Sequence, residues 1–189
     1  MAFDFIEKLY LESSYLIKEI AGILNEEEEK FIIGKSGGSG ISSTISKGLE
    51  PNNVNLWLLK KFSVFFVPKE KIVLRGGGTI TKIDKDLKIL YLRIVLYDKN
   101  IKEPTVYSGV LYDIEKKSET EYPSKFEQVM TILESNDYKV FKNIQKINYE
   151  NVYIKIQGEL VKNNLFEITD SETIVKKIIK PSLELYRKH

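Results

Sequence analysis

The sequence predicts an α+β fold with a mainly antiparallel, partly closed β-barrel and flanking helices. Residues 62–115 contain four runs rich in β-branched and aromatic residues, which are typical of strands. Pro68, glycines 76–78 and an Asp-Lys-Asp turn separate the first runs, and these connections are too short for crossover helices. The run at 87–97 is apolar on both faces, so we expect a strand covered on both sides, in a small barrel or under packed helices.

A chain of 189 residues is long enough for one well-buried core, and we expect a single domain over residues 1–189. Its expected parts are an N-terminal helical region at 1–30, a β-meander core at 31–118, and a helix, β-hairpin and C-terminal helix at 119–189. The basic ending is typical of a domain boundary. The chain is therefore expected to be the N-terminal part of a longer protein.

The first 33 residues predict a helix followed by a short strand. Apolar residues recur at near-helical spacing from Phe3 to Leu24, which indicates an amphipathic helix or a helix pair. The four glutamates at 26–29 are interpreted as a solvated turn or loop. Phe31 to Ile33 is then expected to form a strand.

Beyond the meander, the sequence predicts a helix that opens near Pro123. One apolar stripe on this helix is assigned to the core, namely Phe126, Val129, Met130 and Leu133. Alternation over 152–160 predicts a strand, and Asn163-Asn164 is expected to turn the chain into a second strand at 165–168.

The last helix is expected to start at about Ser171. Thr169 and Glu172 have the spacing of a capping box, in which two side chains satisfy the first backbone N–H groups of a helix. Pro181 lacks a backbone N–H, so we expect it to break or kink the helix.

Positive charge is concentrated in one part of the chain. Residues 60–102 contain eleven Lys/Arg and four acidic residues, whereas the whole chain has a net charge of only +2. A strand-rich segment with this excess suits a surface that faces phosphates. The alternative is that the lysines merely cover the solvated faces of strands and turns.

Composition excludes several chemistries. The chain has no cysteine, and its only histidine is the last residue, His189, which excludes disulfides, a Cys/His zinc site and a Ser-His-Asp triad. No cofactor is predicted. Because no apolar run approaches the roughly 18 residues of a membrane span, we expect a cytoplasmic protein with no membrane partner.

The glycine-rich stretch from Gly34 to Gly40 does not match a P-loop. A P-loop requires a glycine five residues before its Gly-Lys-Ser/Thr, and Glu29 stands at that position. The stretch is therefore interpreted as a loop whose backbone can approach a ligand closely, and we expect no nucleotide hydrolysis.

The order of features from Phe31 to Asp113 resembles the PUA-like superfamily, in particular its YTH and EVE branches. The matching features are an apolar strand, a Lys-Ser loop, a short helix, a tryptophan, a phenylalanine-rich strand and a glycine-containing strand. In this sequence they are Phe31 to Ile33, Lys35-Ser36, Ile41 to Lys47, Trp57, Phe62 to Val67 and Gly76 to Ile83.

This resemblance implies a barrel flanked by helices that holds a modified or flipped base in an aromatic pocket. Similar domains stand at the N-terminus of McrB-type subunits of modification-dependent restriction complexes, which act in phage defence. The resemblance therefore also implies an NTPase motor later in the same chain.

The leading hypothesis is a non-catalytic nucleic-acid recognition domain, with DNA rather than RNA as the expected partner. The residues expected to contact nucleic acid are Lys35, Ser36, Trp57, Lys69, Lys71, Arg75 and Lys82. Trp57 is interpreted either as a stacking residue or as part of the core.

Two other classes of function remain open. The first is a metal-dependent nuclease, in which Asp98, Glu115 and Lys117 would hold a divalent cation beside the scissile phosphate. The second is an adaptor domain that binds only protein, which is favoured if the basic residues prove to be scattered.

Overall fold

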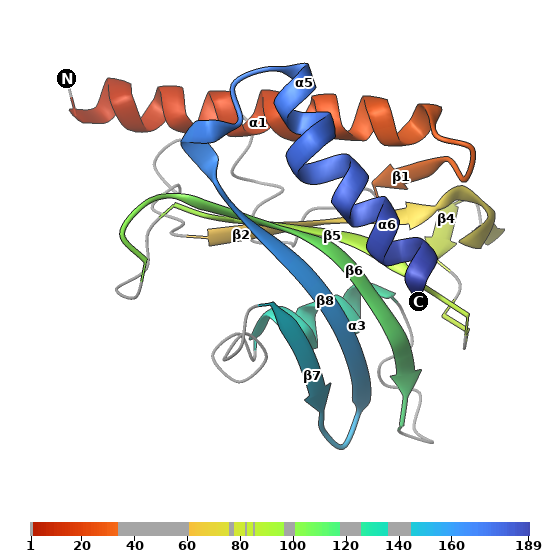
Figure 1. Cartoon of the computed structure of the whole chain (residues 1–189). Helices are drawn as coiled ribbons and strands as arrows, with labels where there is room; N and C mark the ends of the chain where they lie inside the picture. Colours follow the sequence, from red (N-terminus) through yellow and green to blue (C-terminus); the bar gives the residue numbers. More distant parts are fainter. Residues whose placement is uncertain are drawn as a thin grey trace.

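The structure is a computed structural model that describes residues 2–33, 61–75, 78–81, 83–84, 86–96, 101–117, 126–135 and 145–189. The chain is α+β, with an antiparallel sheet and helices on both of its faces (Figure 1). The N-terminal elements are α1 (Ala2–Glu26), β1 (Phe31–Ile33), β2 (Lys61–Pro68), the 3-10 helix η2 (Lys69–Lys71), β3 (Ile72–Arg75) and β4 (Gly78–Thr81). The central elements are β5 (Ile89–Val95), β6 (Thr105–Lys116) and α3 (Phe126–Ser135). The last are β7 (Lys146–Glu150), β8 (Ile154–Asn164), the 3-10 helix η4 (Leu165–Glu167), α5 (Ser171–Ile174), the π-helix η5 (Val175–Ile179) and α6 (Lys180–Lys188).

Six strands form the main sheet in the order β1-β2-β5-β6-β8-β7, and every neighbouring pair is antiparallel. The prediction of a mainly antiparallel sheet is confirmed. β1 and β7 are the two edges and do not pair with each other, so the sheet is open. The expected partial closure into a barrel is not confirmed.

The hairpin β3–β4 stands apart from the main sheet as a two-stranded ribbon. β2 pairs directly with β5, with Phe65 opposite Tyr91, although the hairpin lies between them in sequence. The prediction of a continuous meander over residues 62–115 is therefore wrong, because β3 and β4 pair with each other and not with β2 or β5. The physical reason is the short connection between Arg75 and its partner Gly78, since two residues suffice for a tight turn that folds the run back on itself.

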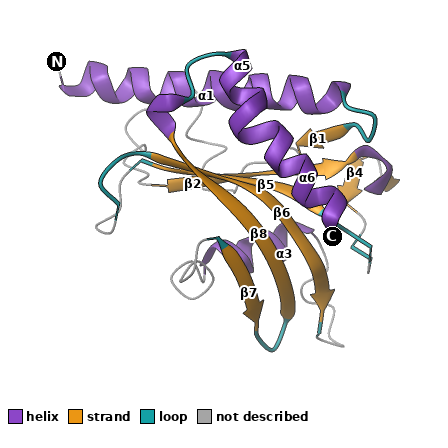
Figure 2. Cartoon of the chain, in the orientation of Figure 1, coloured by secondary structure: helices purple, strands orange, loops and turns teal. Residues whose placement is uncertain are grey.

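Two apolar cores lie on the two faces of the sheet. On one face, α1 and the C-terminal helices pack on β2, β5 and β6, and Ile20 and Ile178 are among the buried residues. On the other face, α3 covers β5 to β8 (Figure 2). All seven residues of β5 are buried, which confirms the prediction of a strand covered on both sides. The predicted apolar stripe of α3 is buried as well.

α1 is one continuous helix, which decides between the single helix and the helix pair that the sequence left open. Lys30, in the turn after α1, adopts a left-handed backbone conformation with φ of 37°, and its N–H donates to Glu27 O at 3.0 Å. This turn closes the helix and directs the chain back along the sheet edge as β1.

The C-terminal hairpin is formed by β7 and β8 and not by the pair of segments predicted from the sequence. Leu165–Glu167 is a 3-10 helix, so the expected strand at 165–168 is wrong. Asn164 Oδ1 accepts a hydrogen bond from Phe166 N at 2.9 Å and thereby caps this short helix. The asparagine pair turns the chain, as predicted, but into a helix instead of a strand.

The final helix begins at Ser171 as predicted, but its capping box is shifted by one residue. Asp170 Oδ1 accepts from Thr173 N at 2.8 Å, and Thr173 Oγ1 lies 3.2 Å from Asp170 N. The predicted box of Thr169 and Glu172 is therefore wrong. The observed pair places the stronger capping residue, an aspartate, at the N-cap.

Pro181 does not break the C-terminal helix, contrary to one of the two sequence predictions. The π-helical turn of η5 precedes it, and the helical run continues through α6. Proline leaves the carbonyl four residues earlier without its helical donor, which is Lys177 O. The side chain of Asn163 donates to this carbonyl at 2.8 Å, so β8 replaces the missing hydrogen bond.

Candidate nucleic-acid interface

Two of the predicted phosphate-contacting residues, Lys69 and Lys71, lie in η2 at the start of the β3–β4 ribbon. η2 follows Pro68 at the end of β2 and leads into β3. The N–H of Lys69 donates to Lys30 O at 2.9 Å, which fixes η2 against the turn after α1. The Lys69 side chain is exposed.

Lys71 is tied to an acidic side chain. Its Nζ lies 2.8 Å from Asp84 Oδ1 and 3.0 Å from Asp84 Oδ2, and both side chains are about four-fifths buried. The ammonium group donates to both carboxylate oxygens, so this geometry neutralises its charge locally. The pair links Lys71, directly before β3, to Asp84, which follows β4.

A surface hollow of about 450 Å³ lies beside Lys69, and acidic residues surround it. Its lining includes Glu28, Glu29 and Glu70 as well as the two lysines at positions 30 and 69. Sequence reasoning placed the glutamates in a solvated turn and did not connect them with Lys69. The antiparallel pairing of β1 with β2 sets Phe31 opposite Pro68. This pairing brings the glutamates that precede β1 next to Lys69 and Glu70, which follow β2.

Lys88 points at the C-terminal helix and not at solvent. Its Nζ donates to the backbone carbonyl of Tyr186 at 3.0 Å and lies 4.4 Å from the centre of the Tyr186 ring. Burial raises the pKa of the Tyr186 phenol to about 12, with smaller contributions from Glu29 and Glu70. Lys88 is thus part of the packing between α6 and the sheet.

Arg93, which contributes to the positive charge of residues 60–102, is buried with 2% of its surface exposed. It stands in β5 beside Ser63 of β2 and Tyr107 of β6. Its Nη1 lies 3.3 Å from the Tyr91 hydroxyl, which is in turn 2.7 Å from Ser63 Oγ. Arg93 therefore belongs to a polar cluster on the α3 side of the sheet, and its charge is not presented to a phosphate surface.

The structure brings together only part of the predicted set. Lys69 and Lys71 are close in η2, and the backbone of Arg75 ends β3 at the tip of the ribbon. Lys35, Ser36, Trp57 and Lys82, by contrast, lie outside the described residues.

The residues of the nuclease alternative have other partners in the described part of the chain. Glu115 Oε2 lies 3.8 Å from Lys155 Nζ, and Lys117 Nζ donates to Glu150 Oε1. Asp98 lies outside the described residues. Among the residues that are described, no three His, Cys, Asp or Glu side chains lie close enough to hold a metal ion.

No family model, curated protein or solved structure matches this chain. No helix in the described part of the chain has the length and hydropathy of a membrane-spanning segment.

Proposed function

We propose that this chain is a non-catalytic nucleic-acid-binding domain that contacts phosphates through η2 and the β3–β4 ribbon, with DNA as the expected partner. The observation that carries the proposal is the position of the ribbon. Within the described residues, β3 and β4 pair with each other and with no strand of the main sheet. Lys69 lies in η2, directly before the ribbon, and Arg75 ends β3. A two-stranded ribbon is narrow enough to enter the major groove of B-DNA.

The neighbouring charges determine which basic side chains are available to contact phosphates. Lys71 is paired with Asp84, so it would have to exchange a buried carboxylate for a phosphate. Lys69 and Arg75 are the better candidates, and Lys35 and Lys82 would add to them. About four phosphate contacts are enough for salt-dependent, sequence-independent binding.

The recognition of a modified or flipped base is a finer proposal that rests on the PUA-like resemblance. It places the base near Lys35-Ser36 and Trp57, with the tryptophan ring stacked on the base. An McrB-type restriction complex, with an NTPase motor later in the chain, is the corresponding biological setting. Both statements rest on the sequence resemblance.

The proposal is tested by charge reversal. The double variant Lys69→Glu/Arg75→Glu is expected to bind a DNA duplex about tenfold more weakly or worse, and equally so for all sequences, because phosphates carry no sequence information. Asp84→Asn is expected to bind more tightly, because Lys71 then loses its ionised partner. Fluorescence anisotropy with a labelled duplex measures both effects.

The matched control is Lys176→Glu/Lys180→Glu, which changes the charge by the same amount at exposed positions of the C-terminal helix. Thermal melts verify that each variant is folded. Equal losses of affinity in the two double variants would show a general effect of net charge and would contradict an interface at the ribbon.

A further inference from the structure

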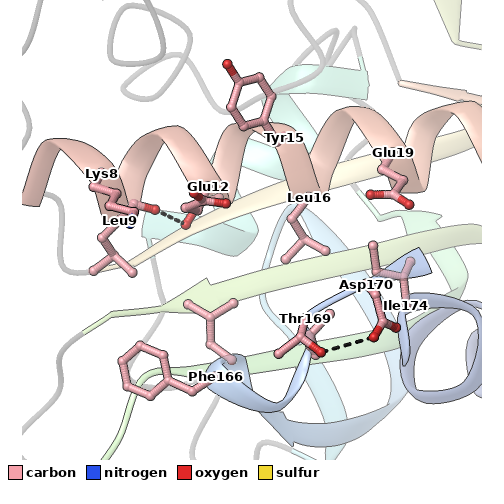
Figure 3. A pocket seen from close by; sticks show the side chains of 13 residues that line it. Lys8, Leu9, Glu12, Tyr15, Leu16, Glu19, Phe166, Thr169, Asp170 and Ile174 are labelled. Carbon is pink, nitrogen blue, oxygen red and sulfur yellow. Dashed lines mark hydrogen bonds between the residues drawn. The ribbon is translucent and has the colours of Figure 1, made fainter. Parts of the chain in front are cut away.

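A groove of about 470 Å³ runs between α1 and the segment from Leu165 to Ile174, at the edge of the core that these helices form with the sheet (Figure 3). Its floor is apolar. Leu9 and Leu16 of α1 point toward the C-terminal segment, and Ile174 of α5 faces them. The size is within the range of about 300 to 1,000 Å³ that is typical of binding pockets.

An aromatic side chain stands exposed at one end of the groove. Phe166 is 55% exposed although it is fully apolar, and it projects from η4 beside the groove. Tyr15 of α1 also lines the groove and is 54% exposed. Exposed aromatic residues next to an apolar groove are typical of sites that anchor a partner side chain.

The rim of the groove is acidic. Three carboxylates line it, those of Glu12, Glu19 and Asp170, against one ammonium group, that of Lys8. Ser171 Oγ donates to Glu19 Oε1, which holds that carboxylate at the rim. The backbone N–H of Thr173 donates to Asp170, and this hydrogen bond lowers the pKa of the Asp170 carboxyl because it stabilises the ionised form.

The combination of floor and rim selects the class of occupant. An apolar floor favours aliphatic side chains from one face of an amphipathic segment, and the carboxylates favour lysine or arginine on its flanks. The same carboxylates repel phosphates, so nucleic acid and anionic lipid are disfavoured here. We propose that this groove binds a basic amphipathic segment of a partner protein. The site is separate from the ribbon and does not depend on nucleic-acid binding.

A display library of random peptides of about 16 residues, selected against the full chain, tests this proposal, because helix-in-groove partners present anchors over about two turns. Enriched peptides are expected to be basic, with aliphatic residues at helical spacing. The affinity of an enriched synthetic peptide is expected to fall about tenfold or more in Phe166→Ser and in Glu12→Lys.

Two matched controls lie outside the groove. Val152→Ser removes an apolar side chain that is 73% exposed, and Glu184→Lys reverses an exposed acid on α6. Both are expected to leave the peptide affinity unchanged within about twofold. Enrichment of peptides without net positive charge would overturn the proposal. Equal losses of peptide affinity in the groove variants and the control variants would overturn it as well. So would self-association of the chain that Phe166→Ser abolishes, since the occupant would then be a second copy.

Discussion

Replacing Gly109 by alanine is expected to destabilise the protein by about 4 kcal/mol or more, which is the range of the severest single substitutions. Gly109 stands in β6, and a Cβ placed there would lie 2.1 Å from Glu159 O and 2.9 Å from Leu160 Cα. Both atoms belong to the backbone of β8, so no side-chain rotation relieves the clash. β6 and β8 are interior strands of the sheet, and separating them would disrupt both cores.

Gly22→Ala is the matched control, since it introduces the same methyl group in α1, where the new Cβ would meet nothing within 4 Å beyond the adjoining backbone of its own helix. It is expected to stabilise the protein by about 0.5 to 1 kcal/mol, because alanine loses less backbone entropy in a helix. Urea denaturation monitored by circular dichroism measures both variants. A Gly109→Ala protein as stable as the wild type would show that β6 and β8 are not paired in this register.

Replacing Tyr186 by alanine is expected to cost about 3 to 5 kcal/mol of the free energy of unfolding, as for other buried aromatic residues. Tyr186 is 7% exposed, and its ring meets the Phe31 ring edge-on, with centroids 5.0 Å apart. Lys88 Nζ lies over the same ring. This one side chain therefore joins α6 to β1 and to the residue that precedes β5.

The conservative variant Tyr186→Phe keeps these ring contacts and isolates the hydroxyl group. The folded-state pKa of about 12 lies above the usual value of about 10, so folding favours the neutral phenol. The stability that the protein gains from keeping this phenol neutral is complete below about pH 10 and is lost as the pH rises through about 12. Tyr186→Phe should therefore lose less stability than the wild type over this interval in urea titrations. Identical pH profiles would contradict the burial of the phenol.

Local patterns in the sequence predicted most of the elements, because helix and strand periodicity is a property of neighbouring residues. The apolar stripe of α3 and the two-sided burial of β5 follow directly from such patterns. The pairing of strands that are distant in sequence could not be predicted from such local patterns. No local signal indicated that β2 would pair with β5 and leave the ribbon outside the sheet, or that Leu165 would begin a 3-10 helix.

The candidate interface was predicted from charge counted along the chain, and the count could not separate exposed cations from buried or paired ones. Arg93 is buried within the sheet, and Lys71 is paired with Asp84, which lies 13 residues further on. Strand pairing also brings Glu28 and Glu29 next to Lys69. These neighbours depend on tertiary structure, which is why the sequence alone overstated the positive charge available to phosphates.

Nucleic-acid binding by this chain is most directly tested by titrating the wild-type protein with a DNA duplex at two salt concentrations. About four phosphate contacts predict an affinity that falls roughly 100-fold between about 50 mM and about 200 mM monovalent salt, because each contact releases condensed counterions. Binding that does not change with salt, or no binding at the lower concentration, would contradict nucleic-acid recognition through the β3–β4 ribbon.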